Sequence, residues 1–153
     1  MMQVGDKIPD FTAIDSEGKP FESSSVIGAK PVVLYFYPKN FTPGCTKEAC
    51  QFRDQYEAFK ELGAEVIAVS SDSPKSHQKF KSAYQLPFIF IADEQKELRR
   101  KFGIKNNAFG LLPGRETFVI DKNGILQMRF NSINATRHMP KALQKLKYLS
   151  KHE

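Results

Sequence analysis

The chain has 153 residues, 41% of them hydrophobic and 26% charged, a balance typical of a folded globular protein with a single domain over residues 1–153. Disordered, collagen-like and membrane-spanning chains are excluded, because the longest apolar run, residues 31–37, is far shorter than the ~20 residues of a membrane span. The formal net charge of +6 is concentrated in residues 129–153, where six lysine or arginine residues accompany one glutamate.

The predicted elements begin with a short hairpin. Residues 11–15 and 19–22 have strand character and flank the turn sequence Ser-Glu-Gly. Residues 31–37 are rich in valine and aromatic residues and are apolar throughout, which predicts a central strand buried on both faces. A loop over residues 38–42 follows this strand.

A helix is predicted after this loop. Over residues 49–62 the apolar residues recur at steps of three and four, as on one helix face, and Gly63 ends the helix. Residues 65–70 form a second buried strand. The next helix spans about residues 73–84, with Ser73 as N-cap and a proline at the first helical position.

The last third of the chain continues this alternation. Residues 88–92 form a strand, and a short helix over residues 93–103 is followed by a loop. A hairpin then joins strands 116–121 and 125–131 through Asp-Lys-Asn-Gly, and residues 139–149 have the apolar spacing of a final amphipathic helix.

The order ββαβαβαββα predicts an α/β fold. Its central sheet is mixed, because the final hairpin is antiparallel, and helices flank the sheet. This order is compatible with a thioredoxin-like fold that carries an N-terminal β-hairpin.

The expected location is the cytoplasm. No basic segment followed by an apolar stretch is visible at the start, and two cysteines are too few for a secreted disulfide scaffold. We therefore expect reduced cysteines at rest and no membrane association. The basic C-terminal end is interpreted as a solvated helix face; the alternative, binding of nucleic acid or an acidic partner, has no accompanying nucleic-acid motif.

The most unusual local sequence, PKNFTPGCTKEAC (38–50), follows the first buried strand. Ligands of open α/β sheets bind beyond the carboxyl ends of the strands, so the candidate site lies here. With Thr42 as N-cap and Pro43 at the first helical position, Cys45 falls in the first turn, at the positive end of the helix dipole. That position favours a nucleophilic thiolate. The alternative is a buried cysteine that packs as a small hydrophobic residue.

Cys50 follows five residues later. In an ideal helix its Cα atom would lie ~8.7 Å from that of Cys45, whereas a disulfide needs Cα atoms within roughly 7 Å. If the two cysteines pair during a reaction, the first turns of the helix must unwind or shift. If they never pair, Cys50 is a core residue beside Ala49.

Metal binding and hydrolysis compete poorly with this interpretation. A structural zinc site needs four ligands, and none of the three histidines lies at ligand spacing from the cysteines, so we expect no metal. His77 and His152 are expected to be solvated. Separation in the sequence does not exclude His138 from lying near Cys45, as a Cys-His hydrolase would require.

The pattern Pro38-x-x-x-Thr42-x-x-Cys45 resembles the active-site signature of peroxiredoxins. Cys50 five residues on is similar to the peroxiredoxin Q, or bacterioferritin comigratory protein, branch of atypical two-cysteine enzymes. The resemblance covers nearly the whole chain through further stretches: GDKIPDF (5–11), AVSSDSP (68–74), LPFIFIADEQKELRRKFGI (86–104), GRETFVIDKNG (114–124) and the region of His138.

The resemblance implies a thiol-dependent peroxidase that reduces hydrogen peroxide and organic hydroperoxides in antioxidant defence, without metal or organic cofactor. Cys45 would be the peroxidatic cysteine, which becomes a sulfenic acid, and Cys50 the resolving cysteine, which condenses with it to an intramolecular disulfide. Thr42 would hydrogen-bond the peroxide and the thiolate, Pro38 would shield the sulfur, and Arg115 would be the active-site arginine. The alternative for Arg115 is a surface position.

The sequence leaves the roles of three residues in this loop and helix open. Glu48 either stabilises the first turns of its helix or holds the active-site loop. Asn40 and Phe41 depart from the family pattern, which often has an acidic residue and then a smaller or polar one. These departures bear on loop mobility and on docking of the reductant.

Thioredoxin or a similar dithiol protein would reduce the disulfide, and a monomer suffices for this cycle. Two other functions are weighed against it. A thiol–disulfide oxidoreductase usually holds its cysteines two residues apart, unlike this chain. A basic binding module would use residues 129–153.

Overall fold

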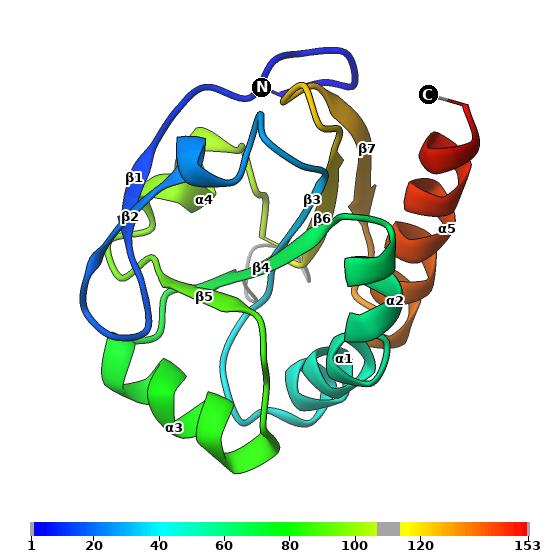
Figure 1. Cartoon of the computed structure of the whole chain (residues 1–153). Coiled ribbons are helices and arrows are strands. Elements are labelled where there is room, and N and C mark those ends of the chain that lie inside the picture. The colour runs from blue at the N-terminus through cyan, green and yellow to red at the C-terminus, as the bar shows by residue number, and fades with distance from the viewer. Residues whose placement is uncertain (1, 107–113, 153) are drawn as a thin grey trace.

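The computed structural model describes residues 2–106 and 114–152. Within them, a central sheet has the strand order β5-β4-β3-β6-β7 (Figure 1). Its strands are β3 (Val32–Phe36), β4 (Glu65–Ser70), β5 (Ile89–Ala92), β6 (Glu116–Ile120) and β7 (Leu126–Asn131). β3, β4 and β5 are parallel, while β6 is antiparallel to β3 and β7, so the predicted mixed sheet is confirmed.

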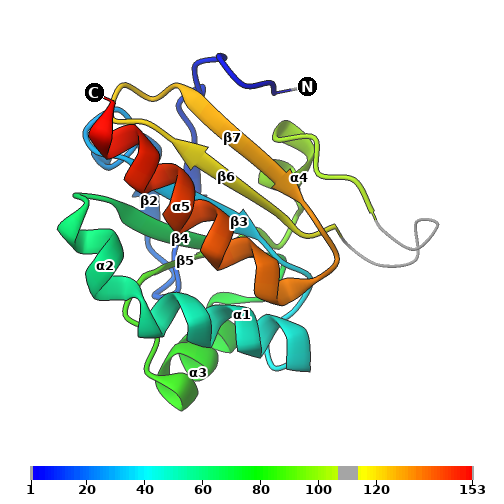
Figure 2. The same cartoon turned by 90° about the vertical axis from the view of Figure 1, so that its right-hand side faces the viewer.

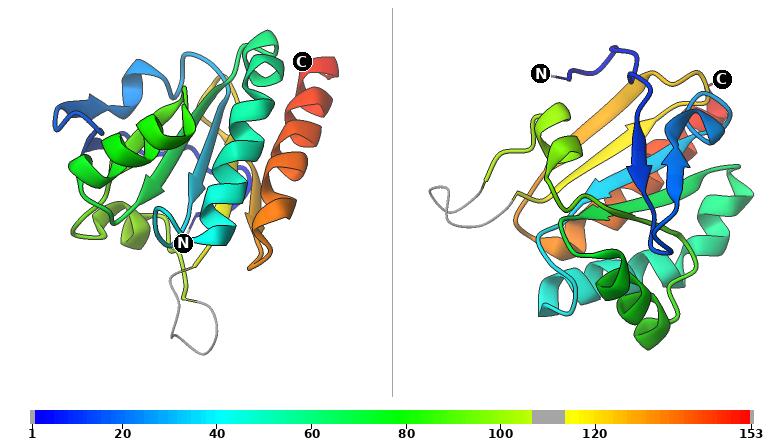
Figure 3. Two further views of the ribbon diagram at one scale, coloured as in Figure 1. Left: turned by 90° about the horizontal axis from the view of Figure 1, so that it is seen from below. Right: turned by 90° about the vertical axis from the view of Figure 1, so that its left-hand side faces the viewer.

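Helices and a hairpin cover the two faces of this sheet (Figures 2 and 3). One face carries α1 (Pro43–Asp54), α2 (Tyr56–Glu61), α3 (Pro74–Tyr84) and α5 (His138–Lys151). The other face carries α4 (Glu97–Lys101) and the predicted N-terminal hairpin, formed by β1 (Thr12–Ile14) and β2 (Pro20–Glu22). Two short 3-10 helices, η1 (Ser23–Ser25) and η2 (Ala135–Arg137), precede β3 and α5.

The composition of β3 explains why both faces are covered. All five of its residues are buried. Val33 and Tyr35 belong to the core under α1, α3 and α5. Val32, Leu34 and Phe36 belong to the core under the hairpin and α4. Because side chains alternate across a strand, a strand that is apolar at every position needs cover on both sides.

The helix predicted to end at Gly63 is divided into α1 and α2. Gln55 interrupts it with φ −105° and ψ 9°, although its amide still donates to the Gln51 carbonyl at 3.2 Å. The apolar spacing does not reveal so short a break, since Phe52 and Phe59 still pack with their ring centroids 5.6 Å apart. Gly63 ends α2 as predicted, with φ 74° and its amide on the Lys60 carbonyl, a geometry that favours glycine.

The short helix predicted from Asp93 begins instead at Glu97. Asp93 stabilises its start from a distance, because its carboxylate accepts hydrogen bonds from the Leu98 and Arg99 amides, both at 3.0 Å. The loop predicted between this helix and β6 lies partly outside the described residues. Among the helices that the structure does describe, none is long and apolar enough to cross a membrane.

Candidate active site

Cys45 lies in the first turn of α1, just beyond the carboxyl end of β3, as predicted. Thr42 occupies the N-cap position with an extended backbone, and Pro43 is the first helical residue. The first N–H groups of a helix have no intrahelical partner, so the thiol of Cys45 lies where the helix dipole is positive. Only 2% of Cys45 is exposed, so only small reactants can reach its sulfur.

The Thr42 side chain does not cap the helix. Its hydroxyl donates to the Lys39 carbonyl at 2.8 Å instead. With its hydrogen used in this way, the hydroxyl oxygen remains an acceptor, as a hydroperoxide O–H would require. Pro38 lies half-buried in the same loop.

Arg115 reaches this site from the start of β6, the strand that pairs with β3. The register of β3 and β6 pairs Phe36 with Glu116, so the residue before β6 lies beside the end of β3. Its Nη2 donates to the Cys45 Sγ at 3.3 Å, and the side chain is buried, so a surface position is wrong. Burial lowers the pKa of Arg115, but Glu48 and Cys45 together raise it by a larger amount. The pKa therefore lies above its ordinary value, and Arg115 remains cationic.

Glu48 holds Arg115 in this orientation. It lies one turn after Cys45 on α1 and is fully buried, and its Oε1 accepts from Arg115 Nη1 at 2.6 Å. Of the two open interpretations, the geometry therefore favours the one in which Glu48 holds the site together. Burial raises the pKa of Glu48 to about 8, against the opposing effect of Arg115.

His138, the first residue of α5, is buried next to Glu48. One ring nitrogen, Nε2, is 2.8 Å from the Ser132 carbonyl and therefore donates, which leaves Nδ1 to accept from the Thr117 hydroxyl at 2.8 Å. Nδ1 is also 3.9 Å from Glu48 Oε2. Burial lowers the pKa of His138 to about 4, so it is neutral at physiological pH. With both nitrogens engaged, His138 is not arranged as a base for Cys45.

A second buried network fixes the loop before α1; we call it the loop anchor and define it as Asn40 with its four partners. The Asn40 amide donates to Asp72 Oδ2 at 2.9 Å, and Oδ1 accepts from the Tyr37 hydroxyl. Its Nδ2 donates to Ser76 Oγ at 3.1 Å and lies 3.0 Å from His77 Nδ1. The anchor thus joins the loop to α3 and to the segment between β4 and α3.

Phe41 adds an apolar contact to the loop anchor. Its ring centroid is 5.1 Å from that of Phe80 and 6.3 Å from that of Tyr84, both on α3. Its φ of 66° is left-handed, which costs a non-glycine residue on the order of 1–2 kcal/mol. Half of the side chain remains exposed, so it forms part of the surface next to Thr42.

The expectation that His77 is solvated is wrong. Its exposed fraction is 0%, and burial lowers its pKa to about 4. A signal was present in the sequence, because His77 lies three residues before the buried Phe80 and so on the same helix face. The prediction counted only apolar residues as members of the buried helix face, and it therefore left this histidine out.

Cys50 lies on α1, half-buried, and both cysteines are free thiols. The helix is continuous between them. The structure therefore brings Cys45 together with Arg115 and Glu48. It does not place Cys45 and Cys50 close enough to form a disulfide.

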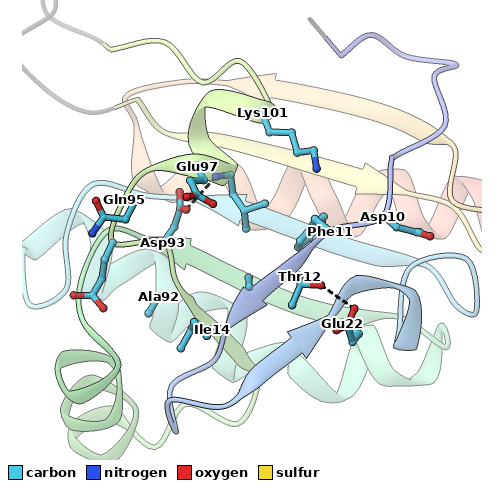
Figure 4. Close-up of a pocket in the computed structure, with 13 residues that line it drawn as sticks. Asp10, Phe11, Thr12, Ile14, Glu22, Ala92, Asp93, Gln95, Glu97 and Lys101 are labelled. Atoms are coloured by element: carbon cyan, nitrogen blue, oxygen red, sulfur yellow. Dashed lines mark hydrogen bonds between the residues drawn. The ribbon is translucent and has the colours of Figure 1, made fainter.

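A cavity of 620 Å³ lies away from this site (Figure 4). The hairpin, the end of β5 and α4 line it, and Cys45 and its neighbours do not. Two of its carboxylates are already engaged, since Glu22 accepts from Thr12 and Asp93 from the α4 backbone. Across residues 2–106 and 114–152, no three His, Cys, Asp or Glu side chains come together to hold a metal ion.

Comparison with known proteins was made on both sequence and structure. The model of the AhpC/TSA family matches residues 4–129. Peroxiredoxin Q, chloroplastic, from Sedum lineare is 48% identical over 146 residues, which are 95% of this chain and 78% of that protein.

Two solved structures have the same architecture. The peroxidoxin BcpB of Mycobacterium tuberculosis superposes with a TM-score of 0.88 at 36% identity, over 97% of this chain and 98% of that one. The bacterioferritin comigratory protein of Xanthomonas campestris, described for its alkyl peroxide reduction activity, gives 0.83 at 30% identity, over 92% of each chain. The predicted thioredoxin-like fold is confirmed. The Sedum relative is chloroplastic by name, so a cytoplasmic location stays a prediction.

Proposed function

Because this chain belongs to the AhpC/TSA family and is a peroxiredoxin, hence a peroxidase, we propose that it reduces hydrogen peroxide and organic hydroperoxides through a sulfenic acid at Cys45. The alkyl peroxide reduction described for the Xanthomonas relative supports the organic part of this range. The observation that carries the proposal is the contact of 3.3 Å between Arg115 Nη2 and Cys45 Sγ, within the first turn of α1.

The chemical step is the transfer of one oxygen atom to sulfur. The Cys45 thiolate attacks the nearer peroxide oxygen, the O–O bond breaks, and the departing oxygen leaves as water or an alcohol after taking a proton. Negative charge grows on that oxygen in the transition state. Donors already aimed at this point stabilise it, and we assign that role to Arg115 and to the first N–H groups of α1. Thr42 accepts from the peroxide O–H, and Pro38 shields the sulfur.

The second step forms a disulfide. The Cys50 thiol condenses with the Cys45 sulfenic acid, with loss of water, and thioredoxin or a similar dithiol protein then reduces the bond. Both cysteines belong to one chain, so a monomer suffices. The cycle needs a compartment in which such a dithiol is kept reduced, and the cytoplasm meets this need.

The two alternative functions gain no support from the described residues. A thiol–disulfide oxidoreductase would need cysteines that pair without unwinding a helix, whereas Cys45 and Cys50 lie five positions apart on α1. For a basic binding module, Arg129 is not part of a free surface, since it bonds to Glu116 and to the Gly103 carbonyl.

The test is peroxide consumption by wild type, Cys45→Ser and Cys50→Ser, with thioredoxin and its reductase as electron source. We expect no turnover for Cys45→Ser. For Cys50→Ser we expect one oxidation of Cys45 at the wild-type rate and then slow or absent recycling. Steady-state turnover by Cys45→Ser would refute the nucleophile. Recycling of Cys50→Ser as fast as wild type would refute only the resolving role.

A further inference from the structure

A second buried arginine, Arg99 on α4, joins the two halves of the active site. Its side chain lies in the interior with 7% of the residue exposed. Nη1 donates to the Gly114 carbonyl at 2.8 Å, and Nη2 donates to the Tyr37 carbonyl at 2.9 Å. Gly114 precedes Arg115 directly, and Tyr37 precedes the active-site loop directly. One guanidinium therefore binds the backbone of both segments, the one that leads to Arg115 and the one that leads to Cys45.

These two carbonyls lie just beyond the paired part of the sheet. The ladder between β3 and β6 ends at Phe36 and Glu116. Past this pair the strands no longer hold each other, yet here Arg115 and the loop that leads to Cys45 must be kept in register. The planar fork of an arginine can span two acceptors with a fixed geometry, which a lysine ammonium cannot do.

The position of Arg99 is itself fixed from several sides. Asp93 Oδ2 accepts from its backbone amide at 3.0 Å. The end of α4 is held to β6 and β7, because Arg129 donates to the Gly103 carbonyl at 2.9 Å and to Glu116 at 2.7 Å. At Gly114 an added Cβ would lie 1.8 Å from the Lys105 carbonyl oxygen, so only glycine fits beside this carbonyl.

We propose that Arg99 is a positioning residue for the peroxidase reaction: by holding Tyr37 and Gly114 it aligns Arg115 with the Cys45 thiolate. The inference rests on the proposed function, since it concerns how fast Cys45 is oxidised. Arg99 does not touch the reacting atoms. It acts through Arg115 and through the loop, and a displacement of about 1 Å in such an arrangement can lower a rate up to about 100-fold.

The test measures the second-order rate constant of Cys45 oxidation by hydrogen peroxide, by rapid quench and mass spectrometry. The variants are Arg99→Met and Arg99→Lys, and the control is Arg100→Met, the exposed neighbour on α4. We expect both Arg99 variants to be slower by about tenfold or more, and the control to stay within about twofold of wild type. The lysine variant separates alignment from charge, because it keeps the cation without the fork.

A double-mutant cycle with Arg115→Lys separates alignment from general destabilisation. If Arg99 acts through Arg115, the loss caused by Arg115→Lys is at least about threefold smaller in the Arg99→Lys background than in wild type. Near-wild-type oxidation by Arg99→Lys, or fully additive losses, would overturn the proposal. A wild-type protein whose Cys45 is not oxidised would refute the proposed function instead, whatever the variants do.

Discussion

Three ionisable groups lie close together at the active site. Cys45 Sγ and Glu48 Oε1 are bound to the two terminal nitrogens of one guanidinium, that of Arg115. If Glu48 were ionised, it would compete with the thiolate for this single positive charge. Burial raises the pKa of Glu48 to about 8, so near neutrality the acid is mostly protonated and serves as a neutral acceptor. The charge of Arg115 is then available to the thiolate and to the departing oxygen.

This leads to a prediction for Glu48→Gln. Glutamine keeps the acceptor oxygen, so at pH 7 we expect the oxidation rate constant of Cys45 to stay within about threefold of wild type. Above pH 8 the wild type acquires a buried negative charge that the variant lacks, and its rate should fall about three- to tenfold relative to the variant. The measurement is the ratio of the two rate constants from pH 6 to 9.5. A constant ratio would show that Glu48 does not titrate in this range.

The helix α1 is held at its start, but it must change shape if Cys50 is to form a disulfide with Cys45. The loop anchor fixes Asn40 to Asp72 and to α3, and Phe41 packs on α3. On the other side, Gly44 lies next to Arg115, since an added Cβ would be in ordinary contact with Nη2 at 3.4 Å. We therefore expect the unwinding to fall within α1 between Cys45 and Cys50, rather than in the loop before it.

Hydrogen exchange tests this expectation. After one equivalent of hydrogen peroxide, amides in the first two turns of α1, among them that of Thr46, which bonds to the Thr42 carbonyl at 2.9 Å, should lose protection by at least about tenfold. The Asn40 amide should stay protected. Cys50→Ser serves as the control, since it is oxidised but forms no disulfide. Formation of the disulfide with unchanged exchange along α1 would contradict the prediction.

Two buried neutral histidines make the stability of the whole molecule depend on pH. The pKa of His77 and that of His138 are each about 4 in the folded protein, below the ordinary value of 6.5, because both are buried. The unfolded chain therefore binds more protons between pH 6.5 and 4, and stability falls as the pH falls through this window. Glu48 acts in the opposite direction: its raised pKa adds stability that is lost as the pH rises toward 8.

The difference between wild type and His77→Asn isolates one histidine. Between pH 7 and 5 the free energy of unfolding of wild type should fall by about 2 kcal/mol more than that of the variant, because the variant has nothing to protonate at this position. Chemical denaturation at each pH measures it. His152→Asn, at the exposed end of the chain, should follow wild type. Parallel curves for His77→Asn and wild type would show that His77 does not remain neutral on folding.

The local features of this protein followed from its sequence. Helix and strand periodicity, the N-cap at Thr42 and the glycine at residue 63 depend on neighbours within a few positions, and they predicted the elements and the place of Cys45 at a helix start. The break at Gln55 was missed because it left the apolar spacing intact. The resemblance pointed to Arg115, but its distance of 70 positions from Cys45 hides the contact from any local pattern.

The sequence therefore carried the fold class, the place of Cys45 at a helix start and its spacing to Cys50, all of which follow from short-range patterns. Folding added the long-range pairings: the end of β3 against the start of β6, the buried acceptor Glu48, the loop anchor with His77, and the bond from Arg99 to two distant carbonyls. These could be known only from the packed chain, because burial and hydrogen bonding between residues far apart depend on how the sheet and its helices come together.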